Sequence, residues 1–182
     1  MKAIMRQLFV LTLTALVSFY FWLLPVSASA QSHSVSVGYG IGVFSNDKII
    51  GHIEEGCYDF INFAYQYERS LSQVLGLVVE PFASYTINPK DGIDAGITLS
   101  LKYKFHKQES NGFFLTFGGG SAYTSINFKE QGTHLLFIIQ TGFGYKWKNF
   151  FVENRIRHYS NAGTAKPNRS INSNIIMVGM NF

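Results

Sequence analysis

The stretch VSVGYGIGV, residues 35–43, determines the fold. Its apolar residues alternate strictly with small ones: Val35, Val37, Tyr39, Ile41 and Val43 against Ser36, Gly38, Gly40 and Gly42. Successive side chains of a β-strand point to opposite faces, so the stretch predicts a strand with one apolar face and one small or polar face. The glycines do not form a dinucleotide-binding fingerprint, because the alternation continues through them and no helical pattern follows.

The same two-faced pattern returns along the rest of the chain. It predicts eight strands, at 34–45, 58–69, 76–87, 94–106, 112–124, 134–147, 149–161 and 173–182. Many have about ten residues or more, the length of a tilted strand that crosses a bilayer. The second faces carry Gln, Glu, Lys and Gly, which are a poor filling for a soluble core. A membrane barrel reverses the soluble arrangement, with the apolar face toward lipid and the polar face toward the lumen.

The C-terminal segment supports a membrane barrel. Phe182 is preceded at a period of two by Met180, Val178 and Ile176, which resembles the last strand of bacterial outer-membrane barrels. Aromatic residues cluster near strand ends, as an interfacial girdle requires. The predicted fold is therefore all-β, an eight-stranded antiparallel transmembrane β-barrel of the outer-membrane type. The predicted location is the bacterial outer membrane.

Residues 1–30 are predicted to be a signal peptide, and residues 31–182 the barrel. The segment has a basic start at Lys2 and Arg6, an apolar run at Leu8–Leu24 and the small residues Ala28-Ser29-Ala30 before Gln31. An uncleaved membrane anchor is the alternative. The A-x-A ending and the immediate change to polar residues favour cleavage.

Charge and cysteine content exclude several functional classes. Loss of Lys2 and Arg6 with the signal peptide lowers the formal charge from +4 to +2, so no nucleic-acid partner is expected. Cys57 is the single cysteine, so no disulfide within the chain is expected. The histidines show no spacing typical of metal ligands, and neither a metal nor a cofactor is expected.

An even number of strands places both chain ends on the periplasmic side, with odd strands running outward. The tight connection at 147–149 is typical of a periplasmic turn. The longer segments at 45–57, 124–133 and 162–172 are typical of outer loops.

The seventh strand, NFFVENRIRHYSN at 149–161, carries the candidate chemistry. Its charged residues Glu153, Arg155 and Arg157 share one face, which we assign to the lumen. Phe150, Val152, Ile156, His158 and Ser160 then face lipid, together with Asn154, a polar residue that the pattern does not explain. His158 and Ser160 lie at the outward end of this strand. Polar side chains aimed at the outer leaflet indicate a function, unless the strand is simply leaving the membrane there.

Two stretches resemble a known family. RHYSNAGTAKPNRSIN (157–172) and EQGTH (130–134) are similar to segments of the lipid A 3-O-deacylase family, the PagL-type outer-membrane acyl hydrolases. The resemblance implies a serine esterase that needs no cofactor and removes the 3-O-linked acyl chain from lipid A of lipopolysaccharide. It implies Ser160 as nucleophile and His158 as general base. It also implies an oxyanion and substrate region at Asn161, Ala162, Gly163 and Asn168.

One position departs from the family pattern. The family has a glutamate fourteen residues after the histidine, and this chain has Asn172 there. Asn172 could orient His158 in a slower enzyme, because an asparagine can accept the imidazole N–H. Alternatively Glu130 supplies the acid, or the barrel has weak or no activity.

Two other functions are compatible with the same pattern. One is a small non-enzymatic barrel of the adhesion or membrane-stabilising kind, which explains the fold but not the outward-facing His158 and Ser160. The other is an esterase for phospholipids, with the same catalytic pair. The expected partners are lipopolysaccharide and outer-membrane lipid, and a homodimer remains open.

Overall fold

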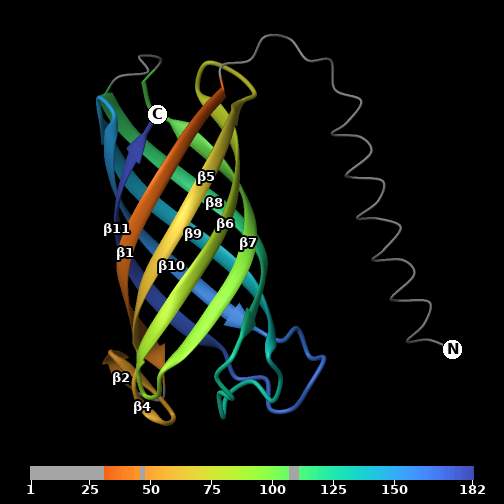
Figure 1. The fold of residues 1–182 in the computed structure, drawn as a ribbon. Helices are drawn as coiled ribbons and strands as arrows, with labels where there is room; N and C mark the ends of the chain where they lie inside the picture. The colour runs from red at the N-terminus through yellow and green to blue at the C-terminus, as the bar shows by residue number, and fades with distance from the viewer. Residues whose placement is uncertain (1–30, 46–47, 107–110) are drawn as a thin grey trace, which may run out of the picture.

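The computed structural model describes residues 31–45, 48–106 and 111–182, so the predicted signal peptide lies outside the described residues. Eight long antiparallel strands follow one another around a barrel, which the pairing of the last strand with the first closes (Figure 1). They are β1 (Gln31–Ser45), β5 (Asp59–Ser70), β6 (Leu75–Asn88), β7 (Gly92–Lys104), β8 (Asn111–Thr124), β9 (Leu135–Trp147), β10 (Phe150–Ser160) and β11 (Ile171–Asn181). The predicted eight-stranded barrel is confirmed. In the part of the chain that the structure describes, no helix is long and apolar enough to cross a membrane.

The two ends of the barrel differ. The terminal end carries the start of β1, the end of β11 and the short connections at 71–74 and 148–149. The loop end, at the bottom of Figure 1, carries the longer connections at 125–134 and 161–170. The short connection at 89–91 also lies at the loop end, so the connection lengths agree in part with the prediction of periplasmic turns and outer loops.

Three short strands extend the loop end where the sequence predicted a plain loop. They are β2 (Lys48–Ile50), β3 (His52–Ile53) and β4 (Gly56–Cys57). β2 pairs with the end of β1, where Val43 lies opposite Ile50 and, on the other side, opposite Asn172. Val43 is buried, so the prediction that it faces lipid is wrong: at the loop end β1 is covered by the folded-back chain.

The outer surface of the barrel is apolar on every side. Val37, Ile97 and Ile139, on three different strands, are 47%, 51% and 57% exposed. Exposed patches of this extent are unusual on a soluble monomer, but they are what a lipid-facing barrel wall requires.

A buried ion-pair network fills the middle of the barrel. Arg155 lies 2.5 Å from Glu80 and 3.0 Å from Glu153, and Arg157 lies 3.6 Å from Glu80. Gln66 donates a hydrogen bond of 2.7 Å to Glu80. Buried charges are stable only when they are paired and hydrogen-bonded, and these side chains come from different strands. The network therefore ties opposite walls of the barrel together.

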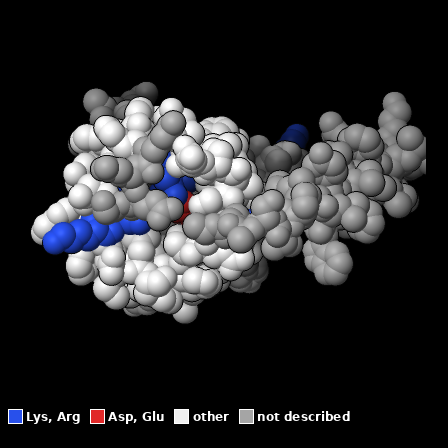
Figure 2. Space-filling view, turned by 90° about the horizontal axis from the view of Figure 1, so that it is seen from above, with Lys and Arg blue, Asp and Glu red and all other residues white. Residues whose placement is uncertain are grey.

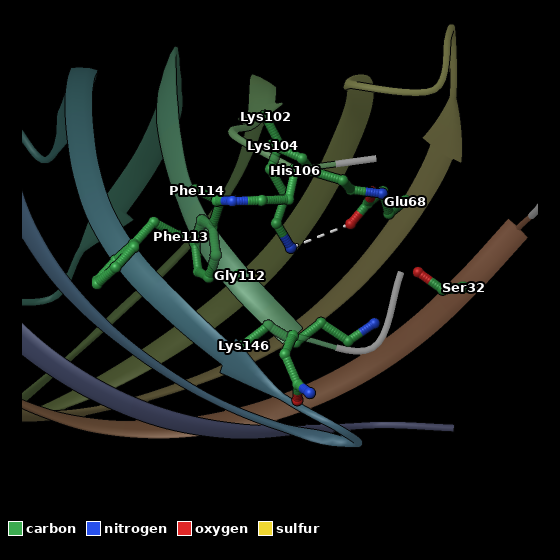
Figure 3. A pocket seen from close by; sticks show the side chains of 10 residues that line it. Ser32, Glu68, Lys102, Lys104, His106, Gly112, Phe113, Phe114 and Lys146 are labelled. Atoms are coloured by element: carbon green, nitrogen blue, oxygen red, sulfur yellow. Dashed lines mark hydrogen bonds and ion pairs between the residues drawn. The ribbon is translucent and has the colours of Figure 1, made fainter. Parts of the chain in front are cut away.

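A second group of charges lies near the terminal end. Glu68 pairs with Lys102 at 3.0 Å and with Lys104 at 2.6 Å. These side chains line a small cavity of about 40 Å³, which Lys146 and His106 also line (Figure 3). Seen from this end, basic atoms lie in the mouth of the barrel beside acidic ones (Figure 2). Charges of opposite sign are thus paired inside the barrel, among Glu68, Glu80, Lys102, Lys104, Glu153, Arg155 and Arg157.

The interior at the loop end contains a cluster of apolar side chains, which corrects the prediction of a polar lumen throughout. Tyr58 packs against Phe60 and, edge to face, against Phe128. Tyr159 and Ile171, where β10 ends and β11 begins, join the same buried cluster. The cluster borders the charges in the middle of the barrel, because Arg157 donates a hydrogen bond of 3.2 Å to the Tyr159 hydroxyl and lies 4.2 Å from the centre of the Phe82 ring. The barrel therefore has a small hydrophobic core beneath the loops of this end.

Inward-facing aromatic rings pack on glycines of the neighbouring strand. Three cross-strand pairs do so: Phe60 with Gly40, Phe114 with Gly144, and Phe151 with Gly179. A Cβ atom added at any of these glycines would overlap the ring. The glycines are therefore needed because an eight-stranded barrel leaves little room inside for its own side chains.

We expect Gly144→Ala to lower the free energy of unfolding by about 1–3 kcal/mol, because the added methyl group collides with the Phe114 ring. Phe114→Leu in the same chain should recover part of the loss. Urea unfolding of the refolded barrel in lipid vesicles measures both effects, with Phe114→Leu alone as the control. Wild-type stability of Gly144→Ala would show that the ring can move aside.

Candidate active site on the outer face

β10 carries His158 and Ser160 on the outer face of the barrel. Both side chains are half-buried, whereas the alternating Arg157 and Tyr159 point inward and are fully buried. On the β9 side, Ile139 lies opposite His158 and Phe137 lies opposite Ser160. The pair thus lies at the loop end, next to the apolar side chains of the lipid-facing wall.

His158 is held by Asn172 on the neighbouring strand. Asn172 on β11 lies directly opposite His158 across the β10–β11 ladder. The His158 Nδ1 and Asn172 Oδ1 atoms are 2.8 Å apart, the distance of a good hydrogen bond. The ring's other nitrogen, Nε2, is directed away from Asn172. An imidazole that donates through Nδ1 keeps Nε2 as the basic nitrogen.

Ser160 lies two residues beyond His158 on the same face. Along a strand this is a separation of about 7 Å between backbone positions, which the two side chains can bridge. Within the described residues, the Ser160 hydroxyl has no hydrogen-bond partner in the protein. It is therefore available to a group in the lipid phase.

Asn161, the next residue, points inward and organises the loop that follows. Its side-chain NH₂ group donates to three backbone carbonyls, those of Gln131 (2.5 Å), Ala165 (3.1 Å) and Pro167 (2.9 Å). Its Oδ1 accepts from the Gly163 N–H at 2.8 Å. The Asn161 side chain is completely buried. One amide therefore fixes the 161–170 loop next to Ser160.

The turn at Ala162 and Gly163 leaves one backbone donor open. Both residues have positive φ angles, 52° and 77°. The Asn161 N–H donates to Asn168 Oδ1 at 3.0 Å, and the Thr164 N–H donates back to the Asn161 carbonyl at 3.0 Å. Among the backbone N–H groups of 161–164, all described, that of Ala162 has no protein acceptor. It is the available donor nearest to Ser160 in the sequence.

Glu130 is occupied elsewhere. It is 1% exposed, and one carboxylate oxygen accepts the backbone N–H of Glu54. Its carbonyl accepts the Arg169 N–H at 2.7 Å, and the Gln131 side chain donates to the Arg169 carbonyl. Glu130 therefore links its own loop to the loops that carry Glu54 and Arg169, and it does not contact the His158 ring.

The EQGTH stretch connects two loops of the loop end, 125–134 and 161–170. Gly132 has a φ of 59°, and a Cβ atom there would overlap the carbonyl of Lys166. His134 makes a 2.8 Å hydrogen bond with the Thr124 carbonyl. Alternation could not reveal these roles, nor that of Gln131, because loop contacts have no period. The similarity of EQGTH to the deacylase family was the one indication in the sequence that this segment matters.

Asn154, unexplained by the sequence, has a partner on the next strand. Its side-chain amide exchanges two hydrogen bonds with that of Asn174 on β11, at 3.0 and 3.1 Å. Two amides that pair with each other lower the cost of facing hydrocarbon. The sequence did not predict this pair, because the register between β10 and β11 is needed to find it.

The described histidines do not gather around a metal site. His33 contacts Tyr65 at the terminal end, and His106 lines the small cavity. His134 bonds to the Thr124 carbonyl, whereas His158 bonds to Asn172. In the described chain no three His, Cys, Asp or Glu side chains form a group that could hold a metal ion.

Comparison with known families assigns the chain. Residues 56–181 match the family model of lipid A 3-O-deacylase (PagL). The chain belongs to this family. The match includes the His158, Ser160 and Asn172 positions as well as the EQGTH stretch. No curated protein matches the sequence.

Solved structures support the fold. The crystal structure of the outer-membrane enzyme PagL is 20% identical, with a TM-score of 0.64, and the alignment covers 80% of this chain and 98% of that one. Neisserial surface protein A is 12% identical with a TM-score of 0.57, covering 83% and 95%. Yersinia pestis Ail in a nanodisc is 13% identical with a TM-score of 0.52, covering 84% and 100%. The chain is thus an outer-membrane β-barrel of the PagL family.

We expect Asn161→Asp to loosen the 161–170 loop, because a carboxylate would face three carbonyl oxygens that now accept its N–H groups. Trypsin added to intact cells should then cut faster after Arg169, since the bond after Lys166 leads into Pro167 and resists trypsin. Asn168→Asp is the matched control, since it keeps the oxygen that accepts the Asn161 N–H. Equal cutting of both variants would mean that Asn161 does not hold the loop.

Proposed function

We propose that this protein is an outer-membrane esterase that removes the 3-O-linked acyl chain from lipid A of lipopolysaccharide, with Ser160 as nucleophile and His158 as general base. The observation that carries the proposal is the His158–Asn172 hydrogen bond on the lipid-facing side of β10. Membership of the lipid A 3-O-deacylase family supports the substrate and the reaction. The site lies at the loop end, where the headgroup region of the outer leaflet would meet the barrel.

The reaction begins at the Ser160 hydroxyl. As Oγ attacks the carbonyl carbon of the ester, His158 Nε2 takes its proton. The tetrahedral intermediate collapses when the sugar oxygen leaves and takes that proton from the imidazolium. Water, activated by the same Nε2, then hydrolyses the acyl-serine and releases a fatty acid. No cofactor enters any of these steps.

The 161–168 turn supplies the oxyanion contact in this proposal. The Ala162 N–H is the donor we assign to the developing negative charge. Asn161, Gly163 and Asn168 act indirectly, because their hydrogen bonds fix the turn in which Ala162 lies. An oxyanion donor of this kind typically contributes a factor of about 10²–10³ to kcat.

Asn172 takes the place of the acid. Its carbonyl oxygen accepts from Nδ1 and so selects the tautomer in which Nε2 is the base. An amide carries no charge, and it stabilises the imidazolium less than a carboxylate does. We therefore propose a complete but slower catalytic unit. The contact of Glu130 with Glu54 argues against Glu130 as the acid.

We expect Ser160→Ala and His158→Ala each to lower lipid A deacylation by about three orders of magnitude or more, with no further loss in the double variant. Both side chains point away from the core, so the barrel should remain folded. Mass spectrometry of lipid A from cells that express each variant measures the product. Thr141→Val, another lipid-facing polar change, is the control. Wild-type product from Ser160→Ala would refute the mechanism, and no acyl release by the wild type from any lipid tested would favour the non-enzymatic barrel.

Substitution of Asn172 tests the third member of the unit. Asn172→Leu should lower kcat by about a hundredfold, because the ring loses its tautomer and orientation. Asn172→Asp or Asn172→Glu should raise kcat by about tenfold, because a carboxylate stabilises the imidazolium. Glu130→Gln should leave kcat unchanged. A large loss in Glu130→Gln with no effect of Asn172→Leu would move the role to Glu130.

A further inference from the structure

The small cavity at the terminal end lies inside the barrel, away from the candidate active site (Figure 3). Its volume is about 40 Å³. A single enclosed water needs about 10–15 Å³ of such space, so the cavity has room for about three waters or for one small oxyanion. Polar side chains from five strands line it: Ser32, Glu68, Lys102, Lys104, Asn111 and Lys146.

The wall of this cavity carries an excess of positive charge. Three ammonium groups and one carboxylate, that of Glu68, line it, so these described side chains have a formal charge of +2. The ion-pair network in the middle of the barrel is balanced, with two arginines against two glutamates. The excess at the terminal end is therefore not offset from the middle. Positive charges that are held together in a low-dielectric wall attract a counter-ion.

Lys102 is the most enclosed of the three lysines. It is 5% exposed, and its ammonium lies 4.5 Å from the centre of the Phe114 ring. Glu68 accepts one hydrogen bond from it at 3.0 Å. An ammonium has three N–H donors, and the described chain offers Lys102 no second hydrogen-bond acceptor. Glu68 is also shared, because Lys104 lies 2.6 Å from its other oxygen. One carboxylate thus serves two cations.

The other polar groups of the cavity add further donors. The Asn111 carbonyl oxygen accepts the Lys148 N–H at 2.9 Å, so its NH₂ group is the part that remains for another partner. Ser32 contributes a hydroxyl, and His106 contributes a ring nitrogen. A lining with many donors and one shared carboxylate suits an occupant that accepts hydrogen bonds at several atoms. An oxyanion does so, and its hydrogen bonds to ammonium groups are of the strong, charge-assisted kind.

The cavity can be reached from the terminal end, which the strand count places on the periplasmic side. The Lys104 side chain is 26% exposed, and His106 is exposed. Figure 2 views the barrel from this end and shows basic side-chain atoms in its mouth. A small ion from the periplasm therefore reaches the lysines without crossing the barrel wall.

We propose that this cavity binds a small oxyanion of the phosphate class, held by Lys102, Lys104 and Lys146. The bound ion offsets the excess positive charge at the terminal end and so stabilises the folded barrel. It comes either as inorganic phosphate or as the phosphate group of a small monoester. The site lies at the opposite end of the barrel from His158 and Ser160, so its occupation does not depend on ester hydrolysis.

Calorimetric titration of the folded protein in a phosphate-free detergent tests the site. Sodium phosphate is added at a constant ionic strength set with sodium chloride, so that general screening does not change. We expect saturable binding of one phosphate per barrel and a higher urea midpoint of unfolding in its presence. Methyl phosphate in a parallel titration shows whether a monoester is accepted as well as the free ion. Absence of saturable binding of either compound overturns the proposal and assigns the cavity to water.

Charge variants locate the bound ion. Lys146→Gln should raise the Kd for phosphate about tenfold, because a charge-assisted contact is lost. Glu68→Gln should lower the Kd about tenfold, because the carboxylate that competes for the lysines is removed. Lys148→Gln is the matched control: it removes one positive charge at the same end, but its ammonium lies over the Trp147 ring and does not line the cavity.

The two cavity variants differ in how much they disturb the fold. Glu68 is buried between two lysines, whereas Lys146 is half-buried near the mouth, so Lys146→Gln decides the matter if Glu68→Gln does not fold. An unchanged Kd in Lys146→Gln, or an equal rise in Lys148→Gln, overturns the assignment to this cavity.

Discussion

The backbone of this protein has no hydrogen-bond partner in lipid other than itself, and this constraint determines most of the structure. Each strand must pair on both sides, so the eight long strands close through β1 and β11. Closure gives each strand one face toward the interior and one face toward lipid. Since side chains alternate, the assignment of one charged residue to the interior assigns its whole strand. Arg157 inside thus means His158 outside.

The interior stabilises the barrel, and the outer face carries the candidate site. Inside, paired charges in the middle and an apolar cluster at the loop end hold the strands and the loops in place. Outside, a few polar residues interrupt the apolar wall. Asn161 connects the two regions, because its inward side chain fixes the turn that follows the outward-facing Ser160. Support for the candidate site therefore comes from behind the wall and not from a surrounding pocket.

The sequence was sufficient for the eight long strands and for most of their faces. Alternation at 149–161 placed His158 and Ser160 outward. The resemblance to the deacylase family drew attention to Asn172, which the β10–β11 register does bring to His158. The Asn154–Asn174 pair could not be found, because it depends on which residues of two strands come together. The hydrogen bonds of Asn161 and Gln131 and the burial of Val43 depend on loops, whose contacts follow no period. The apolar cluster was missed because inward position was equated with polarity.

Because the candidate site faces outward, the concentration that governs its encounters is a surface concentration in the membrane. An enzyme with an aqueous cleft meets molecules that arrive from three dimensions, whereas His158 and Ser160 open onto a sheet of lipid. Anything they act on arrives sideways, by diffusion within one leaflet, and leaves by the same route. The quantity that governs the frequency of such meetings is the number of molecules per unit area of membrane. Dilution of the membrane suspension with water does not change that number, whereas dilution of the leaflet with inert lipid lowers it.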